Sequence, residues 1–253
     1  MESPTSPGCK PAPPFSAGAR LRAVAYYAGQ ALATLLFAPC CVLLYPFPHR
    51  WRYRFTRQWT RFALWWLKCV CKLDFQVQGR EHAAAPAIIA CKHQSAWETF
   101  ALQLVFPPVV FVLKRELLRI PFFGWGLAGL DPIAIDRGSP GAALRAIVRE
   151  GQERLARGLS VVIFPEGTRV APGQRGRYGP TVGLLARKTG CPVIPVAHNA
   201  GWYWPRNGFL KRPGVIRMVV GPPIKAGDRS AREIASLAEE WIESAAARLP
   251  RPD

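Results

Sequence analysis

An uncharged stretch, residues 23–47, limits the folds that are open to this chain. It follows Arg20 and Arg22, and it is long enough to span the hydrocarbon layer of a bilayer as a helix. Because it is longer than the usual core of a signal peptide and lacks a clean small-residue cleavage site, we expect it to be retained. Pro39 interrupts the stretch, so a straight crossing, a kinked span and a re-entrant helix all stay open.

The next segment, residues 49–73, has the clearest helical periodicity in the chain. At about 100° per residue, its basic residues fall on one side and its aromatic and other apolar residues on the other. The two sides are Arg50, Arg54, Arg57, Arg61, Lys68 and Lys72, and Trp51, Phe55, Trp59, Phe62, Trp66, Cys69, Val70 and Leu73. Such a helix suits the headgroup layer of a membrane; the alternative is a soluble helix that packs on the domain core. We predict a membrane-embedded, membrane-anchoring helix pair over residues 20–73, after a disordered N-terminus of residues 1–19 that is rich in Pro, Ser and Gly.

The charge of the chain indicates an anionic partner. Lys and Arg total 34 against 16 Asp and Glu, a net charge of +18, which suits a nucleic acid, an anionic membrane or a phosphorylated substrate. The nine Trp residues and the near-neutral mean hydropathy favour the membrane. The sequence has no helix-turn-helix signal, zinc-ligand spacing or aromatic RNA-binding motif, so we expect no nucleic acid partner.

From Asp74 onward, short β-branched runs alternate with helical stretches, which is typical of an α/β domain. The runs predicted as strands are residues 75–77, 87–90, 109–113, 132–135, 161–164, 193–196 and 215–220. One helix is marked by Ser139 as N-cap, Pro140 in the first position and Gly158 at the end, and another is predicted over residues 230–248. We expect an α/β fold over residues 74–253, with a central, mostly parallel sheet flanked by helices.

A histidine and a carboxylate follow the second predicted strand, in the stretch Cys-Lys-His93-Gln-Ser95-Ala-Trp-Glu98. Residues five apart in a continuous helix point about 140° away from each other, so His93 and Glu98 meet easily only if the chain turns between them. Ser95 provides this turn, since Ser-x-x-Glu is a capping box with Ser95 as N-cap and Glu98 in the first helical turn. Taken alone, the stretch favours a plain helix cap beside a structural loop histidine, because capping boxes are common.

Other polar residues that follow predicted strands shift this balance. They are Lys114, Arg137 and the run Phe164-Pro165-Glu166-Gly167-Thr168-Arg169. Functional groups in such sheets gather in loops at the carboxyl ends of strands. A neutral histidine suits a general base, with a carboxylate behind it to fix its tautomer. Arg169, Lys114 and Arg137 suit a phosphate, which Arg169 can grip in a fork, and Gly167 allows close backbone approach. Individually, Lys114 and Arg137 are also explained as solvated charges, and Glu-Gly-Thr-Arg as a plain turn.

Several kinds of chemistry lack their sequence signals here. There is no Gly-x-Ser-x-Gly elbow for a nucleophilic serine, and Ser95 is assigned to capping. His49, His82 and His198 are scattered without metal-ligand spacing, so we expect no metal site, and there is no phosphate loop. What remains is direct transfer, in which a base deprotonates a hydroxyl that then attacks an activated electrophile.

Over about residues 79–221, the chain resembles the glycerolipid acyltransferases, and within them the bacterial 1-acylglycerol-3-phosphate acyltransferases. The family's His-x4-Asp motif looks matched by His93 to Glu98, and its arginine motif by Ile-Asp-Arg137. Its Glu-Gly-Thr-Arg motif is matched in full by residues 166–169, and its proline-centred apolar strand by Val-Ile194-Pro195-Val. Any one of these motifs is weak alone, whereas all four in order are a strong signal.

The resemblance implies a reaction and a set of roles. His93, oriented by Glu98, would deprotonate the sn-2 hydroxyl of lysophosphatidic acid, and the alkoxide would attack the thioester of acyl-CoA or acyl-carrier protein to give phosphatidic acid. The implied substrate-phosphate residues are Arg169, Lys114, Arg137, Glu166, Gly167 and Thr168, and the implied acyl-donor residues are Ile194 and Pro195. The resemblance also implies no cofactor, membrane lipids as partners, and a place in phospholipid biosynthesis at the bacterial inner membrane, with the active site on the cytoplasmic side.

Two positions depart from the family pattern. Glu98 stands where Asp is usual, which moves the carboxylate by about one carbon–carbon bond, a shift that first-turn geometry can absorb. Ala134 stands where an aromatic residue is frequent, before the arginine motif. Two alternative functions stay open: acylation of another acceptor, such as a lyso-ornithine lipid or glycerol-3-phosphate, and non-catalytic membrane binding through the basic helix.

Overall fold

The computed structural model describes residues 18–136 and 138–252. Residues 1–17 of the predicted disordered segment therefore lie outside the described residues, as does Arg137. The predicted boundary at residue 19 needs a small correction, because helix α1 (Ala19–Leu43) already begins there.

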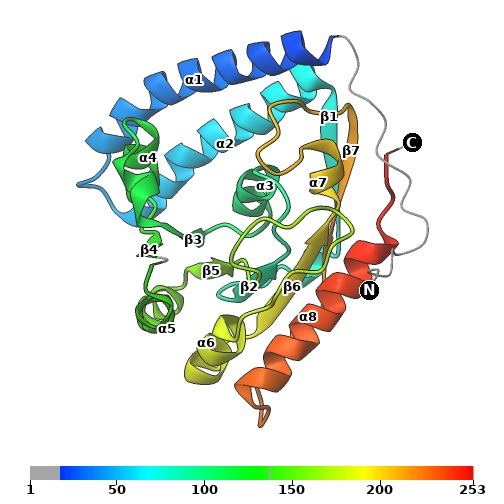
Figure 1. The fold of residues 1–253 in the computed structure, drawn as a ribbon. Helices are drawn as coiled ribbons and strands as arrows, with labels where there is room; N and C mark the ends of the chain where they lie inside the picture. The colour runs from blue at the N-terminus through cyan, green and yellow to red at the C-terminus, as the bar shows by residue number, and fades with distance from the viewer. Residues whose placement is uncertain (1–17, 137, 253) are drawn as a thin grey trace.

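Helices α1 and α2 (His49–Cys71) run antiparallel and side by side along one side of the molecule (Figure 1). The Nε1 of Trp66 donates to the carbonyl of Ala25 at 3.2 Å, and a Cβ at Gly29 would lie only 2.1 Å from that nitrogen. α1 continues through Pro39, and within the described residues it is the one helix long and apolar enough to cross a membrane. The two predicted helices are therefore confirmed, while their insertion into a membrane stays a prediction.

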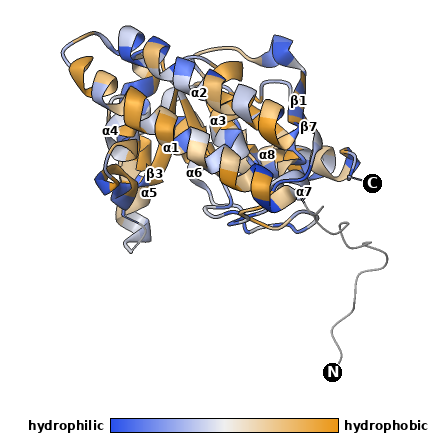
Figure 2. Cartoon of the chain, turned by 90° about the horizontal axis from the view of Figure 1, so that it is seen from above, coloured by the Kyte–Doolittle hydropathy of each residue, from blue (hydrophilic) through white to orange (hydrophobic). Residues whose placement is uncertain are grey.

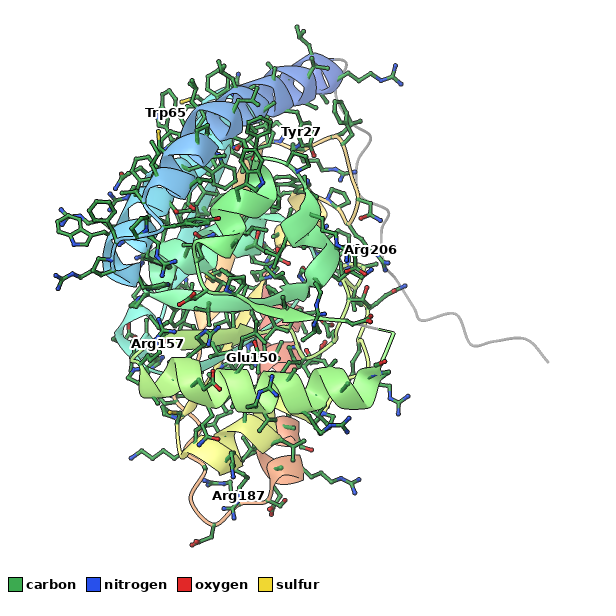
Figure 3. The ribbon with its side chains drawn as sticks, turned by 90° about the vertical axis from the view of Figure 1, so that its left-hand side faces the viewer. Tyr27, Trp65, Glu150, Arg157, Arg187 and Arg206 are labelled. Carbon is green, nitrogen blue, oxygen red and sulfur yellow. The ribbon has the colours of Figure 1, made fainter. Side chains whose placement is uncertain are left out.

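The outer face of α1 is apolar. Figure 2 shows hydrophobic residues recurring along this helix, and the side chains of Leu21, Leu32, Leu36 and Leu43 are 60–76% exposed. Trp65 of α2 lies at the outer edge of the helix pair in Figure 3 and is also exposed. Exposed apolar side chains in this number are typical of a surface that contacts a membrane or another protein.

Helix α2 packs on the domain core with a face that its periodicity did not single out. Tyr53, Leu64 and Leu67 are buried in the core between α2 and the sheet. On the side predicted for the headgroups, the ring of Phe55 instead contacts Phe37 of α1, with centroids 5.3 Å apart. The alternative of a helix on the domain core is therefore correct for the buried face, and headgroup contact stays a prediction.

All seven predicted strands are present and form one sheet. They are β1 (Leu73–Gln78), β2 (Ile88–Cys91), β3 (Val109–Lys114), β4 (Ile133–Ile135), β5 (Ser160–Ile163), β6 (Val193–His198) and β7 (Gly214–Val220). Their order across the sheet is β1-β7-β6-β2-β5-β3-β4. Every pairing is parallel except β6 with β7, which is antiparallel. The prediction of a mostly parallel sheet is confirmed.

Helices cover both faces of the sheet (Figure 1). α2 and α3 (Trp97–Val105) pack on one face, and α5 (Pro140–Ala156), α6 (Thr181–Thr189) and α8 (Ala231–Arg248) pack on the other. The shorter elements are η1 (Arg80–His82), η2 (Arg115–Arg119), α4 (Phe123–Ala128) and α7 (Ala200–Tyr203). The predicted α/β class, with flanking helices and a preceding helix pair, is confirmed.

The helix boundaries follow their sequence signals. α5 begins with Pro140 after Ser139, and Gly158 just past its end has φ +78°, where glycine costs least. α8 begins with a reciprocal capping box, since Glu233 N donates to Ser230 Oγ at 3.2 Å and Ser230 N donates to a Glu233 oxygen at 2.7 Å. Both predicted helices are confirmed.

Candidate active site

Three neighbouring parallel strands bring the predicted polar residues to one edge of the sheet. β2, β5 and β3 lie side by side, so the loops after their carboxyl ends meet. His93 follows β2, Lys114 ends β3, and Thr168 and Arg169 follow β5. All four side chains line one cleft of about 390 Å³. The structure thus gathers residues that the sequence separates by up to 76 positions, 93 to 169.

The predicted contact between His93 and Glu98 is present. Nδ1 of His93 lies 2.8 Å from Oε1 of Glu98, and the same oxygen accepts the backbone amides of Gln94 at 3.0 Å and Ser95 at 2.9 Å. Because a carboxylate oxygen only accepts, Nδ1 of His93 carries the hydrogen. Nε2 is then the unprotonated nitrogen, which suits a base that faces the cleft.

The local fold around Ser95 differs from the prediction in one detail. α3 starts at Trp97 with Ala96 as its N-cap, and Ser95 Oγ accepts the amide of Trp97 at 3.2 Å. The reciprocal capping box is therefore wrong as predicted, although Glu98 still reaches back to the amide of Ser95. The helix therefore starts one residue later than predicted.

Glu98 is held as an anion in the protein interior. Its side chain is fully buried, and burial alone would raise the pKa of its carboxyl. The hydrogen bonds from His93 and from the amide of Ser95 outweigh this burial, so the pKa of Glu98 is lowered. A carboxylate in this position stabilises an imidazolium on His93 when the base takes up a proton.

The ring of His93 is fixed by stacking as well as by hydrogen bonding. It stacks on the ring of Phe164 with centroids 4.0 Å apart and planes inclined by 18°. The loop after β5 also fixes the backbone, because Val170 N donates to the carbonyl of His93 at 2.8 Å. The first and third sequence motifs therefore form one interlocked structure.

The cleft offers cationic and polar groups opposite His93. Arg169 is half-buried, and its Nε finds no hydrogen-bond partner among the described residues. Lys114 and Thr168 are exposed at the cleft, and Arg206 joins them while donating to the carbonyl of Arg169 at 2.8 Å. A half-buried guanidinium with an unused N–H is a favourable site for an anionic oxygen.

Other predicted site residues lie elsewhere. The Glu166 carboxylate turns into the interior, where it binds Lys92 and the amide of His93, so its position differs from that of a phosphate-binding group. Gly167 is exposed in the turn after Phe164, with φ +66°. Ile194 and Pro195 are buried in β6, which places them in the sheet. Their predicted role at an acyl-donor site stays a prediction, and Arg137 lies outside the described residues.

Sequence reasoning missed several residues around His93. Phe164 lies within the motif that was recognised, so its place beside the base could have been inferred. Lys92, His198 and Glu243 carry no local signal, because their contacts join residues 74 to 151 positions apart. Arg206 lies in a loop with no recognised pattern, and only the fold brings it to the cleft.

Comparisons with known proteins agree with this geometry. Residues 74–199 match the family model described as Acyltransferase. A 1-acyl-sn-glycerol-3-phosphate acyltransferase from Pseudomonas aeruginosa is 44% identical, over 90% of this chain and 91% of its own length. A protein of the same name from Cocos nucifera is 26% identical, over 87% of this chain and 71% of its own length. The crystal structure of the 1-acyl-sn-glycerophosphate (LPA) acyltransferase PlsC from Thermotoga maritima has a TM-score of 0.73 and 21% identity, over 92% of this chain and 98% of that chain, which shows a shared fold.

Proposed function

The chain belongs to the glycerolipid acyltransferase family, and we propose that it acylates the sn-2 hydroxyl of lysophosphatidic acid to form phosphatidic acid in phospholipid biosynthesis. The observation that carries this proposal is one cleft lined both by His93, which is paired with Glu98, and by the guanidinium of Arg169, whose Nε has no hydrogen-bond partner among the described residues. The activity named for the Pseudomonas relative supports the choice of acceptor.

The reaction follows from the tautomer of His93. Nε2 takes the proton from the acceptor hydroxyl, and the alkoxide oxygen attacks the carbonyl carbon of the thioester donor. The carbon–sulfur bond then breaks, and the leaving thiolate takes the proton from the imidazolium. Glu98 keeps Nδ1 protonated throughout and stabilises the transient positive charge. No step requires a metal or a resident cofactor.

The cationic side of the cleft suits the phosphate of the acceptor. Arg169 would grip two phosphate oxygens in its fork, with Lys114 and Thr168 at the exposed rim. We propose that Gly167 allows the tight backbone turn beside the site, and that Glu166 supports His93 by accepting its backbone amide. We retain Arg137 as a further candidate cation.

A mostly apolar cavity beside the cleft suits the fatty chains of the substrates. A cavity of about 580 Å³ is lined by residues such as Ala31, Phe100 and Phe209, and it shares Trp59 and Phe123 with the cleft. Its walls include residues of α1, α2 and α4, so the helix pair contributes to substrate binding as well as to anchoring. The exposed leucines of α1 support contact with a membrane. We propose that this membrane is the bacterial inner membrane, with the active site on its cytoplasmic side, where acyl-CoA and acyl-carrier protein are available as donors.

The test is acyl transfer to lysophosphatidic acid in detergent or bilayers, from acyl-CoA and from acyl-carrier protein, by the wild type and His93→Ala. We expect phosphatidic acid from the wild type and none from the folded, membrane-bound variant. Turnover of another lyso-lipid alone would keep the chemistry and refute the acceptor. A variant as active as the wild type would refute the catalytic role of His93.

A further inference from the structure

The residue before His93 is a buried cation with several anchors. Lys92 is 1% exposed, and its ammonium donates to Glu166 Oε1 at 2.8 Å, to Glu243 Oε1 at 2.7 Å and to the carbonyl of Gln174 at 3.3 Å. The hydroxyl of Tyr178 donates to the same oxygen of Glu243 at 2.7 Å. Each of the three ammonium hydrogens thus has an acceptor, which is what a buried lysine needs.

Glu166 connects this cluster to the catalytic loop. One of its oxygens accepts the ammonium of Lys92, and the other accepts the backbone amide of His93 at 2.8 Å. The two oxygens belong to one rigid, planar carboxylate and move together. A displacement of the Lys92 ammonium therefore also displaces the oxygen that holds the His93 amide. The cluster therefore acts on the backbone of the base, whereas Glu98 acts on its ring.

His198 holds the other end of Lys92. Its ring is fully buried at the end of β6, with Nε2 2.8 Å from the carbonyl of Lys92 and Nδ1 accepting the amide of Ala200 at 3.2 Å. Since Nδ1 accepts, Nε2 carries the hydrogen and donates it to the backbone carbonyl of Lys92. Burial lowers the pKa of His198, which keeps this neutral tautomer in place.

We propose that Lys92, Glu243 and His198 form a rear clamp that positions His93 for proton transfer. Glu243 lies on α8, which runs along β6 on the face of the sheet away from α1 and α2 (Figure 1). Glu243 lies outside all four sequence motifs, and through Lys92 it makes the C-terminal helix part of the structure that positions His93. This inference rests on the proposed acyltransferase function only for its kinetic readout.

The charges of the clamp make a clean test possible. Lys92 faces two carboxylates, those of Glu166 and Glu243. Glu243→Leu removes one acceptor of the Lys92 ammonium and leaves the Lys92–Glu166 ion pair, whose net charge is zero. Glu243→Gln keeps an acceptor for Lys92 without the charge. The matched control is Glu239→Leu, one turn earlier on α8, where the carboxylate binds Arg175 at the surface.

Two measurements test the clamp: the kinetics of acyl transfer, and hydrogen exchange in the peptide that contains His93. We expect Glu243→Leu to lower kcat about tenfold, with both KM values within about twofold of wild type, because a small misplacement of a base affects the chemical step. Amide exchange around His93 should become faster. Glu243→Gln should recover most of kcat, and Glu239→Leu should match the wild type in both measurements.

Unchanged kcat and exchange in Glu243→Leu would overturn the proposal, as would equal losses in Glu239→Leu or a Gln variant as impaired as the Leu variant. If Glu243→Leu does not fold, His198→Asn decides, because it keeps an acceptor for Ala200 and removes the donor to Lys92. A wild type without activity on lysophosphatidic acid would refute the proposed acceptor. The exchange comparison would still decide the clamp.

Discussion

Glu98→Gln is the substitution that separates the charge of this carboxylate from its shape. Oε1 of Glu98 faces three donors, His93 Nδ1 and the amides of Gln94 and Ser95. A glutamine will therefore place its oxygen toward them, because the reverse orientation would set its NH₂ group against three N–H groups. His93 keeps its tautomer and its orientation, and what the variant loses is the negative charge beside the imidazolium.

The size of the loss follows from the distance. The two side chains are in contact at 2.8 Å, and their delocalised charges lie roughly 4 Å apart, where an effective dielectric constant of about 20 gives an attraction of about 4 kcal/mol. The attraction operates only when His93 is protonated, so it acts on the transition state and not on the neutral ground state. About 4 kcal/mol corresponds to about a 10³-fold fall in kcat, with KM little changed.

The assay is the initial rate of acyl transfer at saturating substrates, with a thermal melt to confirm folding. Glu98→Asp is the matched control, since it keeps the charge and shortens the side chain by one methylene. We expect it to lose about tenfold or less through misplacement. A folded Glu98→Gln that loses less than about tenfold in kcat would refute the role of this charge in catalysis.

Three further substitutions test other parts of the structure. Arg169→Lys keeps the charge but loses the fork, so it should raise KM for the phospholipid more than KM for the acyl donor in initial-rate assays; equal effects would contradict phosphate binding. Gly183→Ala should lower Tm by about 4 °C or more, because the new Cβ would lie 1.8 Å from the carbonyl oxygen of Ala231 and force α6 from α8; an unchanged Tm would contradict this close contact. Burial lowers the pKa of Lys211 to about 7 in the folded protein, whereas the pKa of lysine in an unfolded chain is about 10.4. Between these two pH values the unfolded chain binds more protons than the folded one, so the free energy of unfolding rises with pH. Lys211→Met should flatten this rise in thermal melts, and an unchanged slope would contradict the assignment.

The strands could be predicted because each is a short apolar run with polar or turn residues at both ends. Their order could not, because nothing local in β7 shows that it pairs antiparallel with β6. The buried face of α2 was missed for a physical reason as well. Thr60 is fully buried there and donates to the side chain of Gln103 at 3.1 Å, whereas periodicity counts apolar residues only.

The candidate site divides in the same way. His93 and Glu98 are five residues apart, so spacing and turn chemistry were enough to predict their contact, even though the cap itself begins at Ala96. The inward turn of Glu166 could not be predicted, because its partner Lys92 is one of many basic residues in a chain of charge +18. Whether a lysine is buried depends on residues distant in the sequence, so the sequence around Lys92 does not reveal it.

Local and distant contacts therefore control different properties of the same base. The ring of His93 takes its tautomer and charge stabilisation from Glu98, five residues away in the sequence. Its backbone takes its position from Glu166 and, through Lys92, from a helix near the C-terminus. Changes at Glu98 should alter how strongly the transition state is stabilised, whereas changes at Glu243 should alter where Nε2 lies relative to the acceptor hydroxyl. Both classes of variant lower kcat, Glu98→Gln about 10³-fold and Glu243→Leu about tenfold. Only Glu243→Leu should also speed amide exchange around His93, so kinetics and exchange together distinguish the two classes.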